Sequence, residues 1–193
     1  MKPLFLAAAA ALALAATPAL AEPVAYTIDP THTQTTFQID RFGFTTIFGA
    51  FTASEGTIWI DEADPSKSRV EASVKTASLF AGDPTRDDHL KGARWLNAEA
   101  NPVITFKSTK VIPTGKDTAD VAGDFTLNGV TKPVVFKVKL NKLAVAPGSG
   151  KPTAGFTIMG EVDRTDYGIT VAAGVIGNKV GIRIEALAVA PAK

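Results

Sequence analysis

The side chains best suited to chemistry are few. The 193-residue chain has two histidines, His32 and His89, and no cysteine. Asp87 and Asp88 precede His89 and are residue types that bind zinc, but adjacent helical positions point in different directions and form no ligand face. The lack of cysteine excludes disulfides and thiolate sites, and no nucleophile-elbow, phosphate-loop or dinucleotide motif occurs. We therefore expect no metal, no cofactor and no catalytic residue.

Arg86 and His89 are the best-placed polar pair, because residues three apart on a helix share a face. A guanidinium and an imidazole together can hydrogen-bond a quinone carbonyl or, more strongly, a phosphate. The alternative is that Arg86 pairs with a carboxylate and His89 serves only as a structural hydrogen-bonding group. His32 and Arg41, nearer the start of the chain, are further candidates for holding a polar head group.

Phenylalanines cluster between residues 37 and 51. The runs Phe42-Gly43-Phe44 and Phe48-Gly49-Ala50-Phe51 break strict alternation and contain glycine, which predicts a bend or bulge lined with aromatic rings, as at the mouth of a barrel. An ordinary aromatic core is the alternative, because a small barrel either fills itself or holds one small ligand. The side chains that we predict to line a tunnel are Phe37, Ile39, Phe44, Phe48, Phe51 and Phe106.

The elements that would position these residues are mostly strands. Apolar and polar residues alternate with a period of two, the pattern of half-buried strands, in windows at 104–109, 120–127, 134–141, 156–163 and 179–185. Asn128-Gly129 lies between two of these windows and predicts a tight hairpin. About eight or nine strands at this spacing indicate an antiparallel sandwich or barrel.

One stretch departs from the strand pattern. Asp83-Pro84 predicts a helix start, and residues 86–96 lack alternation. We expect one or two short helices here, with Leu90, Trp95 and Leu96 packing inward. A helix over an all-β element closes an edge or a barrel end.

The first 21 residues predict a signal peptide. Lys2 precedes a 13-residue apolar run, Leu4–Ala16, which is too short to span a bilayer, since spanning takes about 20 residues. Ala19-Leu20-Ala21 then offers small residues to a signal peptidase, so we expect cleavage before Glu22 and a barrel domain over 22–193; an uncleaved anchor or a buried helix is the alternative.

The charge balance narrows the choice of partners. Twenty basic and nineteen acidic residues give a net charge of +1. A nearly neutral chain without a block of like charge argues against nucleic acid as a partner. An exported chain without cysteine is consistent with a bacterial periplasm.

Six blocks of sequence, in order, resemble the YceI-like family of exported, lipocalin-like polyisoprenoid-binding proteins. The blocks are Thr31-His32-Thr33 through Phe51, Lys75-Thr76-Ala77-Ser78, Arg86-Asp87-x-His89-Leu90, Pro102 through Ser108, Gly123 through Pro133, and Arg164-Thr165-Asp166-Tyr167-Gly168 followed by Val180-x-Ile182. This chain has Arg41 and Asn128 where histidine is common in the family, and Ala50 where arginine is common.

The resemblance implies an all-β fold, an extended lipocalin-like eight-stranded antiparallel barrel with a short helical insertion. It also implies an apolar tunnel that holds a polyisoprenoid, such as a quinone tail or a polyprenyl phosphate. We therefore expect a periplasmic, non-enzymatic binding protein with a long apolar lipid as partner and transient contact with the inner membrane. A binder of other amphiphiles, including lipophilic stress molecules, and a ligand-free accessory protein are the alternatives.

Overall fold

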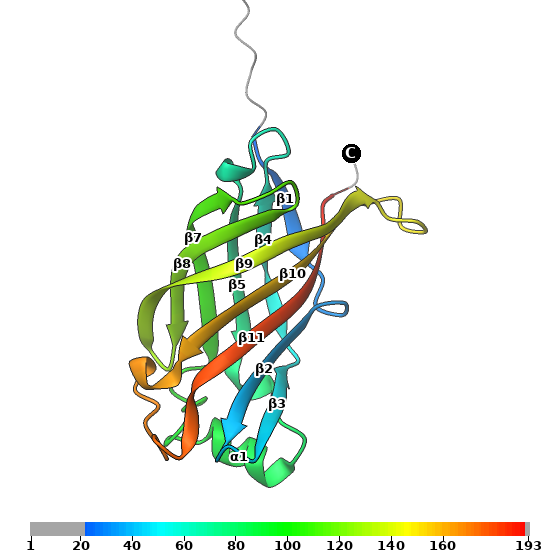
Figure 1. The fold of residues 1–193 in the computed structure, drawn as a ribbon. Coiled ribbons are helices and arrows are strands. Elements are labelled where there is room, and N and C mark those ends of the chain that lie inside the picture. The colour runs from blue at the N-terminus through cyan, green and yellow to red at the C-terminus, as the bar shows by residue number, and fades with distance from the viewer. Residues whose placement is uncertain (1–21, 192–193) are drawn as a thin grey trace, which may run out of the picture.

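In the computed structural model, which describes residues 22–191, strand segments close into an eight-stranded antiparallel barrel with one short helix (Figure 1). This confirms the predicted fold class. The strand segments are β1 (Val24–Ile28), β2 (Gln34–Arg41), β3 (Thr45–Phe51), β4 (Ser54–Ile60), β5 (Arg69–Lys75), β6 (Leu79–Phe80), β7 (Val103–Pro113), β8 (Thr118–Leu127), β9 (Val130–Val145), β10 (Pro152–Asp163) and β11 (Ile176–Val189).

Three of the eight barrel strands are interrupted. β1 and β2 both pair with β11, at Ile28↔Ala188 and Thr35↔Ile184, so they are two parts of one bent strand. Next to them, β4 pairs with β1 and β3 pairs with β2, and in the following strand β5 pairs with β4 and β6 with β3. The pairing of β1 with β11 closes the barrel.

Two tight turns each contain two successive residues with positive φ. Asn128 (φ 50°) and Gly129 (φ 74°) join β8 to β9, which confirms the predicted hairpin. Phe42 (φ 60°) and Gly43 (φ 72°) join β2 to β3, so a hairpin turn stands where the sequence predicted a bend or bulge. Two successive residues with positive φ match the twist of paired strands. At the β2–β3 turn the Asp40 carboxylate accepts a 2.9 Å hydrogen bond from the Gly43 amide.

The helix α1 (Pro84–Lys91) lies across one end of the barrel (Figure 1). Its start is as predicted, because the Asp83 side chain accepts a hydrogen bond from the Arg86 amide and Pro84 occupies the first turn. The helix is shorter than the predicted segment and ends before Gly92. Within residues 22–191, no helix has the length and apolar character needed to cross a membrane.

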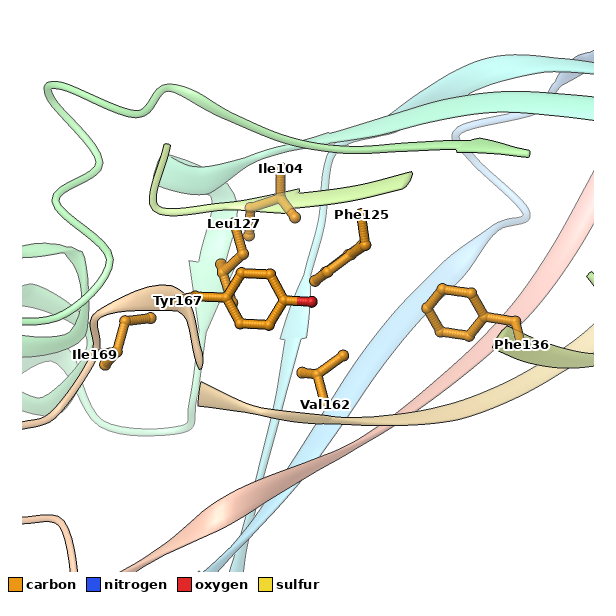
Figure 2. Close-up of a cluster of buried hydrophobic side chains, with 7 residues drawn as sticks. All are labelled: Ile104, Phe125, Leu127, Phe136, Val162, Tyr167 and Ile169. Carbon is orange, nitrogen blue, oxygen red and sulfur yellow. The ribbon is translucent and has the colours of Figure 1, made fainter. Parts of the chain in front are cut away.

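The buried side chains form two clusters. The smaller cluster lies at the β1 end of the barrel, where Tyr26 packs with Ala154, Ala188 and Ala190. The larger cluster lies toward the α1 end and includes η3 (Arg164–Tyr167), a short 3-10 turn after β10 (Figure 2). Its members are Ile104, Phe125, Leu127, Phe136, Val162, Tyr167 and Ile169.

Candidate functional site

A cavity of about 560 Å³ occupies the barrel interior. This volume is within the range of about 300–1,000 Å³ typical of ligand pockets. Along β11 the lining runs from Ile176 to Ala186, ten residue steps that at about 3.3 Å each correspond to a length of at most about 33 Å. The interior is therefore not a filled core. Apolar lining side chains include Phe37, Ile39, Ile47, Phe51, Ile58, Leu79, Ile104, Phe106, Phe125, Leu127, Phe136, Val138, Ile158, Val162, Val180, Ile182 and Ile184.

Glycines in the wall explain why large rings leave this space open. Phe37 lies directly over Gly49 of the neighbouring strand, and Phe136 lies over Gly160. A Cβ atom at either glycine would overlap a ring carbon. A glycine in a strand interior marks such a close approach. Each ring thus occupies the space directly over a glycine, where the side chain of a larger residue would stand.

The structure separates the predicted tunnel residues into two groups. Phe37, Ile39, Phe51 and Phe106 line the cavity. Phe44 and Phe48 do not, since their side chains are 91% and 65% exposed.

Strand alternation is the physical reason for this separation. Phe51 stands opposite Thr35, on the inner face of the barrel, whereas Phe48 stands opposite Gln38, on the outer face. Phe44 lies in the β2–β3 turn and is exposed to solvent. The prediction that Phe44 and Phe48 line the tunnel is therefore wrong, because closeness in the sequence does not place clustered rings on one face of a strand.

The predicted polar residues also separate. Arg41, Arg86 and His89 line the cavity, together with Leu90, Trp95 and Leu96 from α1 and the segment that follows it. His32 is not part of the lining. It lies in the β1–β2 connection, where its Nδ1 is 2.7 Å from a carboxylate oxygen of Asp29. Three hydrogen bonds hold that carboxylate, from the Thr31 hydroxyl, the His32 ring and the Thr31 backbone amide, and they lower the Asp29 pKa to about 2.

Arg86 is held by the backbone and not by a carboxylate. Its Nη1 donates to the carbonyl of Ala81 at 2.7 Å. The neighbouring acids are engaged elsewhere: Asp83 caps the helix, and the buried Asp87 accepts a 2.7 Å hydrogen bond from the Ala81 amide. The predicted alternative, an ion pair between Arg86 and a carboxylate, is therefore not formed among residues 22–191.

The residue missed by the sequence analysis is Arg164. It is only 3% exposed, lines the cavity from η3, and its guanidinium lies 5.5 Å from the Trp95 ring. Burial lowers the pKa of Arg164. Its one signal in the sequence was membership of the Arg164–Gly168 block, since no periodicity marks a residue in a turn.

The two ends of the cavity differ. At the β1 end the cluster around Tyr26 closes the barrel, and Tyr26, Ala154 and Ala188 are not among the residues that line the cavity. At the α1 end, Thr85 and His89 both line the cavity and are exposed, so the cavity reaches the surface beside the helix. Within residues 22–191, no cluster of three or more histidine or acidic side chains is placed to hold a metal ion.

Comparison with known proteins gives a consistent result. A UPF0312 protein of Serratia proteamaculans is 37% identical over 177 residues, 92% of this chain and 91% of that protein. Protein YceI of Salmonella arizonae is 36% identical over 154 residues, 80% of each chain.

Solved structures share the fold. BcnA of Burkholderia cenocepacia superposes with a TM-score of 0.75 at 19% identity, covering 83% of this chain and 98% of that one. A polyisoprenoid-binding domain from Saccharophagus degradans, implicated in plant cell wall breakdown, has a TM-score of 0.67 at 16% identity and covers 87% and 99%. The YceI-like domain family matches residues 26–188. The chain therefore belongs to the YceI-like family.

Proposed function

We propose that this protein is an exported, non-catalytic carrier that holds the chain of a polyisoprenoid lipid inside the barrel. The observation that carries the proposal is the cavity, about 560 Å³ in volume and walled mainly by apolar side chains. The Saccharophagus degradans neighbour, whose fold this chain shares, is described as a polyisoprenoid-binding domain. A quinone tail and a polyprenyl phosphate both fit this description.

Burial of the chain supplies the affinity. Each buried methylene contributes about 0.8 kcal/mol, so a few isoprene units reach about 8 kcal/mol, the equivalent of micromolar affinity, after association costs. No reaction is needed for this role. A chain longer than the cavity folds back or extends past α1, where the cavity reaches the surface.

Native mass spectrometry of the protein purified from its own periplasm tests the proposal. We expect a bound species whose mass corresponds to a polyisoprenoid. A copurified amphiphile of another class would favour the broader lipid-binding alternative. A ligand-free mass, together with failure to take up added polyprenol, would favour an accessory protein without a ligand.

We also propose export to the periplasm, where the lipid would be exchanged with the inner membrane. The predicted signal peptide, residues 1–21, lies outside the described residues, so the support is the sequence motif. The intact mass of the exported protein should begin at Glu22. Retention of residues 1–21 in a membrane fraction would contradict cleavage.

A further inference from the structure

Aromatic side chains gather on the outside of the barrel at the α1 end. Every phenylalanine that is exposed among residues 22–191 belongs to this group. The group, here called the aromatic patch, consists of Phe42 and Phe44 in the β2–β3 turn, Phe48 on β3 and Phe80 on β6. Single exposed apolar side chains are common on soluble proteins, but a gathering of large ones marks an interaction site.

Strand pairing brings the rings of the patch together. Phe48 and Ala50 share the outer face of β3, and Ala50 pairs with Phe80. Phe48 and Phe80 are therefore diagonal neighbours on that face, about 7–8 Å apart. Leu79, next to Phe80, is buried and lines the cavity, as alternation requires. This part of the wall thus borders the cavity on one face and exposes phenylalanine rings on the other.

The aromatic patch lies beside the opening of the cavity. Asp40 and Arg41, directly before Phe42, line the cavity, and so does Asp83, three residues after Phe80. The helix α1 contacts β6 and lies beside the end of β3 (Figure 1). Because the cavity reaches the surface beside α1, a molecule that enters or leaves it passes close to the patch.

The charged residues at this end balance one another. Segments 40–44 and 81–96 contain four acidic and four basic residues, with His89 counted as neutral: Asp40, Asp83, Asp87 and Asp88, and Arg41, Arg86, Lys91 and Arg94. Attraction to an anionic membrane surface through charge requires an excess of lysine and arginine. We therefore expect any partner of this surface to be recognised through the rings and not through net charge.

The exposed area of the patch distinguishes between kinds of partner. The exposed fractions of Phe42, Phe44, Phe48 and Phe80 are 41%, 91%, 65% and 58%, equivalent to about two and a half complete side chains. At about 150–250 Å² each, this is on the order of 400–600 Å². A stable protein interface takes about 800 Å² from each partner, so the patch is small for a second copy of the chain. A bilayer needs no matching surface, because aromatic rings insert into its interfacial region.

We propose that the aromatic patch docks the protein on the surface of a zwitterionic lipid bilayer, with the opening of the cavity facing the membrane. The proposal rests on the proposed lipid-carrier function and identifies the surface through which that function operates. A docked barrel receives an isoprenoid chain directly from the bilayer. The chain then avoids bulk water, in which its methylenes are poorly solvated.

Binding to phosphatidylcholine vesicles tests the docking surface. We expect the protein to cosediment with these vesicles at both low and high salt, since salt screens charges but does not weaken ring insertion. Phe44→Ser and Phe80→Ser should each lower the vesicle affinity by about threefold or more, and the double variant by about tenfold or more. Both side chains are exposed, so these changes should leave the fold intact.

Val145→Ser is the matched control. Val145 is 65% exposed, like Phe48, but it pairs with Pro152, whose carbonyl accepts a hydrogen bond from the amide of Ala190 in the cluster at the closed end. Its vesicle affinity should equal that of the unmodified protein. An equal loss in Val145→Ser and in Phe44→Ser would overturn the patch as the docking surface.

A fluorescent probe tests the orientation of the docked protein. The chain has no cysteine, so Thr46→Cys, between Phe44 and Phe48, provides a single site for a fluorophore that responds to polarity. Its emission should shift to shorter wavelength when vesicles are added, and a probe on Val145→Cys should not respond. The same shift at both positions would overturn the proposed orientation.

Uptake of farnesol from solution separates docking from the proposed function. It is followed by the emission of Trp95, which lines the cavity, in a Trp59→Phe background, because Trp59 is outside the lining. Phe44→Ser should change farnesol affinity less than about twofold, since an exposed ring does not touch the cavity. Farnesol uptake without vesicle binding would overturn the docking surface and leave the function standing. Vesicle binding without farnesol uptake would support docking and contradict the function.

Two further outcomes would overturn the proposal. Binding to anionic vesicles alone, lost at high salt, would show that charge and not the aromatic patch holds the protein on membranes. Self-association of the unmodified protein in sedimentation velocity, abolished by Phe44→Ser, would show that a second copy covers the patch.

Discussion

The two ends of the barrel use small residues in opposite ways. At the β1 end, Ala154 and Ala188 pair directly, are fully buried, and leave room for Tyr26 to fill the interior. Further along, Gly49 and Gly160 lie beneath phenylalanine rings and allow those rings to lie against the wall. At the β1 end, the small alanines let Tyr26 fill the barrel interior. Further along, the glycines let the phenylalanine rings stay close to the wall, so the interior remains open.

The largest expected effect comes from placing a charge inside the open region. Phe51→Asp should reduce polyprenol binding by about 100-fold or more, because an unpaired carboxylate in an apolar cavity costs several kcal/mol and each 1.4 kcal/mol is a factor of ten. Phe48→Asp is the matched control, since Phe48 lies on the outer face of the same strand. Equal losses in both, measured by titration, would contradict the assignment of faces.

Truncating a side chain should lower the free energy of unfolding more at the closed β1 end than beside the open cavity. We expect Tyr26→Ala to lower the free energy of unfolding by about 3–5 kcal/mol, as for buried aromatic residues. Ile39→Ala, at a wall that already borders empty space, should stay near the lower limit of about 2 kcal/mol for such changes. Urea unfolding of the two variants measures the difference, and an equal cost would show that both regions are equally filled.

Gly160→Ala tests the ring that lies over a glycine. The new Cβ would overlap the Phe136 ring, so the ring must move into the cavity, at a cost of about 1–3 kcal/mol in unfolding free energy and with weaker lipid binding. Gly155→Ala, on the same strand, has no atom within 4 Å of the new Cβ. Its stability and lipid binding should therefore remain close to those of the unmodified protein, and equal effects would refute this role for Gly160.

The smallest expected effect on stability concerns Asp29. This residue lies in the connection between β1, at the closed end of the barrel, and β2, which lines the open cavity. The Asp29 pKa is lowered to about 2 by hydrogen bonds from Thr31 and His32, so its stabilising contribution is present above the ordinary value of 3.8 and is lost as the pH falls toward 2. Because the site is solvent-screened, Asp29→Asn should cost about 1 kcal/mol or less near neutral pH. Unfolding curves of the two proteins should converge below pH 4, and a difference that persists at pH 2 would exclude this carboxylate as its cause.

Local signals in the sequence were sufficient for much of the fold. Alternation predicted the strands, Asn128-Gly129 predicted its hairpin, and Asp83-Pro84 predicted the helix start. These features depend on neighbouring residues alone, through side-chain period, positive φ and capping. The signal peptide, which is also a local pattern, stays a prediction.

The candidate site was only partly predictable. Phe37, Ile39 and Phe51 were assigned to the interior, where the structure places them, but Phe44 and Phe48 lie on the surface. The reason is that an exposed ring and a lining ring look alike in sequence once a turn interrupts the alternation. Pairing with the neighbouring strand then decides which face each ring occupies.

Composition and periodicity by themselves determined an all-β chain with alternating faces and a short helix, because these properties arise within a few residues. Whether the barrel is filled or open was decided by contacts between distant residues, such as Phe37 over Gly49 and Phe136 over Gly160. The gathering of Arg41, Arg86 and Arg164 at one end likewise required the strands to close and the helix to lie across them. The shape of the cavity and the position of the charged groups around it are properties of the tertiary structure, since both depend on which side chains the closed sheet brings together.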